Sequence, residues 1–112
     1  MQPSDVIRMR HMLDAASEAQ EFVAGKTRSD LDADRKLTLS LVKSIEIIGE
    51  AATKVTEEAR SECPSIPWQD ITAMRNRLIH AYFDINLDVV WDTIFEELPP
   101  LIKALEATLK QG

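Results

Sequence analysis

Apolar residues recur at intervals of three and four along almost the whole of this 112-residue chain. Such spacing gathers them on one face of an α-helix. The chain contains only three glycines and five prolines, and alanine, leucine, glutamate and lysine, which favour helix, are abundant. The pattern therefore predicts an all-α fold, and the length predicts a single domain over residues 1–112.

The first half of the chain is divided by a break after the first predicted helix. That helix covers residues 1–24, with Ser4 as its N-cap, and ends at Gly25. The second helix starts near Ser29 and is expected to be the longest, because its apolar residues continue to Ala59. Its apolar stripe is wide, which indicates a central place in a bundle or a contact with a second subunit.

Gly49 lies inside this second helix, where glycine costs about 1 kcal/mol relative to alanine. Close approach of another segment would compensate for the cost. Packing within the chain is the simpler explanation, and a dimer contact is the alternative.

Prolines divide the second half of the chain. Residues 63–67 form a break, and a third helix follows and carries the motif discussed below. Asn86 caps a fourth helix that stops at Glu97, before two prolines, and a last short helix holds residues 101–109. The expected architecture is an up-and-down four-helix bundle with a short additional C-terminal helix.

The chemically versatile groups gather between Met74 and Tyr82. This segment holds one of two histidines, His80, the only tyrosine, and Arg75 and Arg77, and it reads R-x-x-x-x-H-x-Y. On a straight helix the arginine and histidine diverge by roughly 140°. Either the helix distorts near the histidine, or a two-fold partner brings the two groups together from different subunits.

Arginine and histidine beside a phosphodiester suffice for RNA cleavage without a metal. His80 can act as general base or acid, and Arg75 can hold the phosphate and offset its charge. Asn76 could orient the imidazole or contact the phosphate. Arg77 is either an exposed helix residue or a secondary phosphate contact. The sequence near the motif has no carboxylate cluster with metal-ligand spacing, so no metal or cofactor is expected.

The net charge of −6 argues against a broad basic face for nucleic acid but leaves room for a small basic cleft. Arg8 and Arg10 could extend such a cleft or only keep the first helix soluble. The single Cys63 excludes an intramolecular disulfide, which favours a cytoplasmic setting. No apolar run approaches the roughly 20 residues of a membrane span.

Three other residues have simple structural interpretations. Trp68 and Trp91 occupy apolar positions of helices and are expected in the core. His11 is expected to be structural or solvated.

The chain resembles the HEPN superfamily, and more narrowly its toxin branch with the R-x-x-x-x-H-x-Y motif. The likeness covers roughly residues 5–109 and depends on an ordered set of motifs: Ile48-Gly49-Glu50-Ala51-Ala52, Pro67-Trp68, Arg75 to Phe83, Val90-Trp91 and Leu98-Pro99. Ala81, where glycine is common in the family, is a small departure that affects none of these roles.

This resemblance implies a homodimer joined through the motif-bearing face and a metal-independent endoribonuclease toxin that leaves 2′,3′-cyclic phosphate ends. Arg75 and His80 would be the catalytic pair, with Asn76 and Arg77 in support. The implied partners are RNA and a nucleotidyltransferase antitoxin that silences the toxin by transferring AMP to Tyr82; neither DNA nor a membrane is expected.

A second interpretation belongs to a different functional class. Some members of the superfamily are non-catalytic binding modules that partner a nucleotidyltransferase and contribute to nucleotide binding. A basic, open cleft around His80 would favour RNA cleavage, whereas a buried or acid-lined histidine would favour the binding module.

Overall fold

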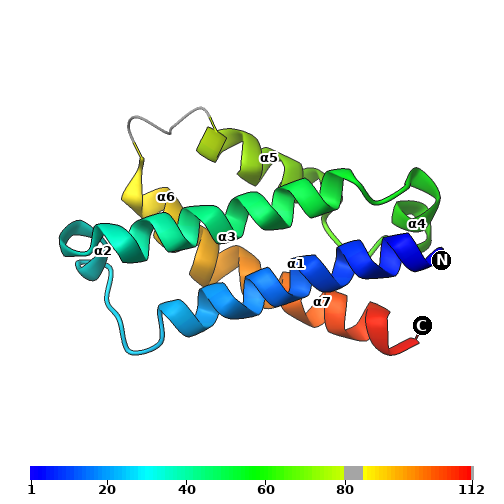
Figure 1. The fold of residues 1–112 in the computed structure, drawn as a ribbon, viewed down its shortest axis with the longest axis horizontal. Coiled ribbons are helices and arrows are strands. Elements are labelled where there is room, and N and C mark those ends of the chain that lie inside the picture. Colours follow the sequence, from blue (N-terminus) through cyan, green and yellow to red (C-terminus); the bar gives the residue numbers. More distant parts are fainter. Residues whose placement is uncertain (80–84, 112) are drawn as a thin grey trace.

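The computed structural model describes residues 1–79 and 85–111 of the chain, and every regular element in these ranges is helical (Figure 1). The predicted all-α fold is confirmed. The elements are α1 (Pro3–Phe22), α2 (Asp30–Ala33), α3 (Arg35–Thr53), α4 (Glu57–Glu62), α5 (Trp68–Ile79), α6 (Leu87–Asp92), the π-helical segment η1 (Thr93–Glu97) and α7 (Leu98–Gln111).

Four long helical segments run alternately up and down, so the two ends of the chain lie at the same end of the bundle (Figure 1). They are α1, α3, α5 and the continuous run α6–η1–α7. Helix α3 packs against both α1 and α5, and α7 closes the bundle against α1. The predicted central position of the second helix is thus confirmed for α3.

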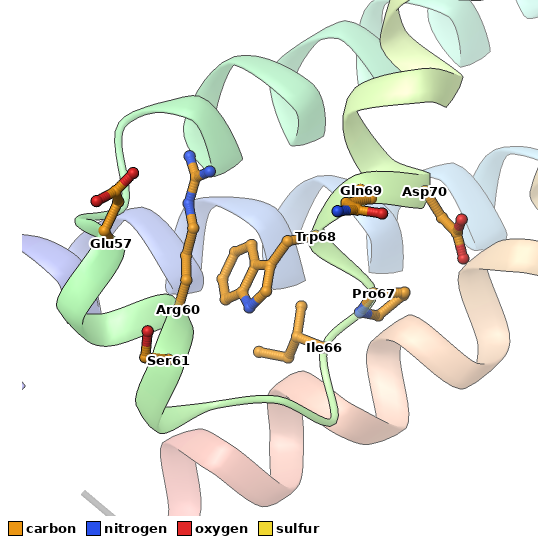
Figure 2. Close-up of a pocket in the computed structure, with 8 residues that line it drawn as sticks. All are labelled: Glu57, Arg60, Ser61, Ile66, Pro67, Trp68, Gln69 and Asp70. Carbon is orange, nitrogen blue, oxygen red and sulfur yellow. The ribbon is translucent and has the colours of Figure 1, made fainter.

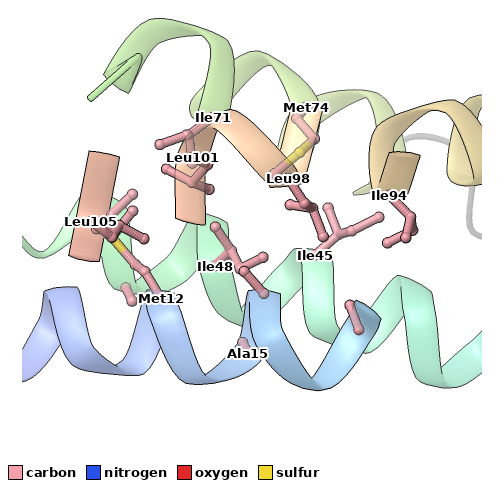
Figure 3. Close-up of a cluster of buried hydrophobic side chains, with 14 of the residues drawn as sticks. Met12, Ala15, Ile45, Ile48, Ile71, Met74, Ile94, Leu98, Leu101 and Leu105 are labelled. Atoms are coloured by element: carbon pink, nitrogen blue, oxygen red, sulfur yellow. The ribbon is translucent and has the colours of Figure 1, made fainter. Parts of the chain in front are cut away.

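The core fills the space between these four segments. Its side chains come from every long segment, and Figure 3 shows part of this cluster. Several side chains are fully buried: Met9, Met12, Leu41, Ile45, Ile48, Ile94, Leu98 and Leu105. Full burial of one such side chain stabilises the fold by about 1.5–3 kcal/mol. None of the helices in the described ranges combines the length and the apolar character needed to cross a membrane.

The second predicted helix is in fact three helices, α2, α3 and α4. Asp34 has an extended backbone (φ −119°, ψ 95°), and its carboxylate accepts a hydrogen bond from the Leu37 amide, which starts α3. Thr56 starts α4 in the same way through the Ala59 amide. At these two cap residues the backbone leaves the helical conformation, but the apolar spacing continues across them. Periodicity alone therefore predicted one helix. With 20 residues against 19, α1 is longer than α3.

The first helix also begins differently from the prediction. Gln2, not Ser4, is the N-cap residue of α1, and Pro3 occupies the first turn, where its missing N–H costs nothing. The helix ends at Phe22. Gly25 has a φ of +74°, a left-handed conformation that glycine adopts without strain and that lets the chain turn towards α2.

A last helix follows Glu97 as predicted, but it is not short, and no break separates it from the helical segment before it. The backbone stays helical through Pro99 and Pro100, and α7 has 14 residues. A proline ring clashes with the carbonyl group four residues earlier in an α-helix, and the wider turn of η1 lies where that clash would occur. The short extra helices are α2 and α4. The predicted cap at Asn86 is confirmed, because its side-chain oxygen accepts from the amides of Asp88 and Val89.

Both tryptophans are half-buried at the edge of the core, not inside it. Trp68 donates its indole N–H to the carbonyl oxygen of Cys63 at 3.1 Å, and Trp91 packs against the ring of Phe95. Cys63 itself is a buried free thiol, and burial raises its pKa, so it stays protonated at neutral pH.

A buried carboxylate joins the start of α1 to the start of α4. Asp5 is 1% exposed and accepts two hydrogen bonds from Thr56, one from the amide at 2.9 Å and one from the hydroxyl at 2.8 Å. The same hydroxyl oxygen accepts from the Ala59 amide. One threonine thus caps α4 and fixes α4 to α1.

Asp5→Ala is expected to lower the free energy of unfolding by about 1–3 kcal/mol, because it leaves a Thr56 donor without its buried acceptor. Urea denaturation followed by circular dichroism measures the change. Asp14→Ala, at an exposed position of the same helix, is the control and should change stability by less than about 0.5 kcal/mol. Equal effects of the two substitutions would contradict this role for Asp5.

Candidate active site

The motif residues that the structure describes lie on different faces of α5. Arg75 faces α3 and its side chain is 25% exposed, whereas Asn76 and Arg77 face solvent. The guanidinium of Arg77 lies 3.4 Å from the carboxylate of Glu97. Residues two apart on a helix point roughly 200° from each other, so Arg77 is not brought together with Arg75.

His80 and Tyr82, the predicted general base and modified residue, lie outside the described residues. Their roles stay predictions. Arg75, the other half of the proposed catalytic pair, lies within the described residues.

The Arg75 side chain lies directly over Gly49. A Cβ atom placed on Gly49 would be 2.5 Å from the Arg75 Cβ, 2.7 Å from its Cδ and 2.8 Å from its Cγ, closer than real Cβ atoms approach other groups. Packing within the chain therefore accounts for this glycine, as predicted, although the group that approaches it is a side chain. The absence of a Cβ at Gly49 lets α5 lie close to α3.

The residue after this glycine binds the head of the same arginine. The Arg75 Nη2 atom donates to the Glu50 Oε1 atom in an ion pair, and the Glu50 side chain is 52% exposed. Within the described part of the chain, the buried Nε–H of Arg75 has no hydrogen-bond acceptor. Gly49 thus makes room for the aliphatic part of the side chain, and Glu50 holds its guanidinium.

Arg75 and Glu50 line an open cleft of about 430 Å³. Helix α3 forms its floor, and α1 and α5 lie on either side of α3 (Figure 1). The lining residues are Arg8 and His11 from α1, Lys43, Glu46, Ile47, Glu50 and Ala51 from α3, Lys54 just after α3, and Arg75 from α5. Arg10, which could have extended such a cleft, is not among them.

The cleft is locally basic in an acidic chain. It contains four cationic side chains and two carboxylates, so its formal charge is +2 with histidine neutral, whereas that of the whole chain is −6. An anion is attracted to such a site even when the protein as a whole is negative. His11, expected to be structural or solvated, is exposed at the edge of this cleft.

A larger cavity, of about 610 Å³, has different chemistry (Figure 2). It lies between α4 and the start of α5 and contains none of the motif residues. Arg60 stands over the Trp68 ring at 5.7 Å and donates to the Ala52 carbonyl oxygen at 2.8 Å. With Glu57 and Asp70 also lining it, this cavity carries a net negative charge and is unsuited to phosphate.

The sequence motif identified Arg75 but gave no indication that Glu50 contacts it. The signal available was the position of Glu50 directly after a helical glycine, which marks a close contact. Across residues 1–79 and 85–111, no group of three or more histidine, cysteine, aspartate or glutamate side chains is arranged to hold a metal ion.

Comparison with known proteins assigns a family to this arrangement. The family described as "Ribonuclease HepT-like" matches residues 12–108. "Putative RNase TTE0752" of Caldanaerobacter subterraneus is 37% identical over 103 residues, which cover 92% of either chain. "Probable ribonuclease HepT" of Thermococcus cleftensis is 36% identical over 80% of this chain and 84% of its own length. No solved structure matches the chain.

Gly49→Ala is expected to destabilise the protein by about 1–3 kcal/mol, because the new methyl group would overlap the Arg75 Cβ, the least movable part of that side chain. The sign of the change in unfolding free energy distinguishes this contact from an ordinary helix position, where replacing glycine with alanine stabilises by about 1 kcal/mol. Chemical denaturation of the two proteins measures the difference. A more stable Gly49→Ala protein would show that Arg75 does not pack against residue 49.

Proposed function

The chain belongs to the ribonuclease HepT-like family, and on this premise we propose that it is a metal-independent endoribonuclease, the toxin of a toxin–antitoxin pair. The observation that carries the proposal is the place of Arg75, which is held by Gly49 and Glu50 beside an open, locally basic cleft. The names of the relatives, which call them RNases, support the same activity.

The proposed reaction uses two side chains of the motif. The imidazole of His80 removes the proton of a ribose 2′-hydroxyl, and the 2′-oxygen attacks the adjacent phosphorus. The bond from phosphorus to the 5′-oxygen breaks, and the leaving oxygen takes a proton from water. Arg75 binds the non-bridging oxygens and stabilises their developing charge. The products carry a 2′,3′-cyclic phosphate and a 5′-hydroxyl.

A homodimer would bring the motifs of both protomers to one groove. Arg75 and His80 are five residues apart, and a regular helix would aim them in different directions. Exposed apolar side chains outside the cleft, Ile7 on α1 and Leu39 on α3, support a partner surface on these helices. In the proposed assembly the arginine of one protomer acts with the histidine of its partner.

One observation favours a non-catalytic binding module that partners a nucleotidyltransferase. In the RNA-free chain the guanidinium of Arg75 is already neutralised by Glu50. In a nuclease, Arg75 must give up part of its ion pair with Glu50 in order to bind phosphate, whereas in a binding module the ion pair can stay intact.

Purified protein in EDTA is expected to cleave RNA and leave cyclic-phosphate ends. Arg75→Ala and His80→Ala should each lower the rate by about 100-fold or more, because each removes a group that acts on the transition state. Arg10→Ala, which removes an arginine outside the cleft, is the control and should cleave normally. A folded, unmodified wild type that does not cleave would favour the binding module.

Mixing the two inactive variants tests the composite site. If arginine and histidine act across the dimer, a mixed dimer keeps one intact site, and random exchange restores about a quarter of the wild-type activity. If both groups act within one protomer, the mixture stays inactive.

Silencing is proposed to occur at Tyr82 by a nucleotidyltransferase antitoxin. The tyrosine oxygen attacks the α-phosphorus of ATP and pyrophosphate leaves, which places an AMP group near the phosphate-binding arginine. Its bulk and negative charge would exclude RNA.

Tyr82→Phe is expected to cleave RNA but to remain active after incubation with the antitoxin and ATP, because phenylalanine has no hydroxyl to accept AMP. Wild type treated in parallel should lose its activity. Cleavage assays before and after incubation measure both. Equal silencing of the two proteins would overturn this account.

A further inference from the structure

Basic side chains converge on the cleft from two helices and are not all explained by the proposed catalytic pair. Arg8 and His11 lie one turn apart on α1, at one side of the cleft. Lys43 on α3 and Lys54, the C-cap residue of that helix, are eleven residues apart, which is about 16 Å at the helical rise and nearly the same helix face. The cations therefore extend along the cleft well beyond Arg75.

Two of these cations are not neutralised. Lys43 lies 3.8 Å from Glu46, and Arg75 is paired with Glu50. The side chains of Arg8 and Lys54, by contrast, make no ion pair or hydrogen bond within residues 1–79 and 85–111. Both residues line the cleft, so their unpaired charges are available to an anion bound there.

We propose that Arg8 and Lys54 form a phosphate-binding subsite that holds single-stranded RNA away from the bond that is cleaved. The choice of RNA as the ligand rests on the proposed function. Arg75 would contact the phosphate at the cleaved bond, and Arg8 and Lys54 would contact other phosphates of the same strand. An open, elongated cleft suits a chain of repeated phosphates better than a single nucleotide, which binds in an enclosed pocket. Ile47 and Ala51 supply the apolar surface between the charges.

The subsite also accounts for RNA binding by an acidic protein. Each phosphate neutralised on a single strand contributes about 0.7 to the slope of log affinity against log salt. Two contacts contribute about 1.4, which corresponds to about 25-fold in affinity at 0.1 M salt relative to 1 M. A few local contacts therefore suffice, and no broad basic face is needed.

The test compares two double variants with the same formal net charge. R8Q/K54Q removes the two cleft cations, and R10Q/K103Q removes two exposed cations, on α1 and α7, that do not line the cleft. The probe is a short 2′-O-methyl oligoribonucleotide, which has no nucleophilic hydroxyl and so reports binding without cleavage. Its affinity is measured by fluorescence anisotropy over a range of KCl concentrations, and circular dichroism confirms that both proteins are folded.

The R8Q/K54Q protein is expected to bind the probe about 25-fold more weakly at 0.1 M salt, with a salt slope reduced by about 1.4, and the R10Q/K103Q protein should bind like wild type. Equal binding by the two variants, or no binding by wild type, would overturn the subsite. Weaker binding of the nucleotidyltransferase alone, with RNA binding unchanged, would also overturn it and assign the cleft to the antitoxin.

Cleavage of unmodified RNA separates this proposal from the function on which it rests. A wild type that binds the probe through Arg8 and Lys54 but cleaves nothing would disprove the nuclease and leave the subsite intact. A wild type that cleaves RNA, with a rate unaffected in the R8Q/K54Q protein at low RNA concentration, would disprove the subsite and leave the nuclease intact.

Discussion

The close packing of Arg75 against Gly49 is the contact on which the site depends. It fixes the distance between α3 and α5, and both helices also supply core residues beside it, Ile48 and Met74. The long aliphatic part of an arginine can lie on an apolar helix surface while its charged end reaches solvent. One side chain therefore belongs to the packing of the bundle at its base and to the charge of the cleft at its tip.

The fold could be predicted from sequence where burial determines it and not where backbone hydrogen bonds do. Apolar spacing predicted the all-α class and the alternating path of the long helices, because the same residues fill the core. It predicted α2, α3 and α4 as one helix, because the caps at Asp34 and Thr56 end the helical conformation without changing the spacing of the apolar side chains. The two prolines led to a predicted end of the fourth helix at Glu97, because sequence patterns give no sign that a π-helical turn can accommodate them.

The site was predictable only in part, for a related reason. The motif identified Arg75 because arginine and histidine stand close together in sequence, and Gly49 marked a close contact without naming its partner. The cleft joins residues as far apart as Arg8 and Arg75, so no local pattern contains it. The net charge of −6 left room for a small basic cleft but could not give its position, because the average over the whole chain conceals a patch of opposite sign.

The topology has a consequence for the timing of folding. Consecutive long helices pack on each other, α1 with α3 and α3 with α5, and such local pairing lets helical bundles fold in microseconds to milliseconds. Ribosomes add only about 5–20 residues per second, so each helix can dock soon after it emerges. Helix α7 packs on α1, so the bundle closes only after α7 has been made. A bundle that folds this fast leaves little time in which a partner could act on the unfolded chain, so a partner would meet it already folded.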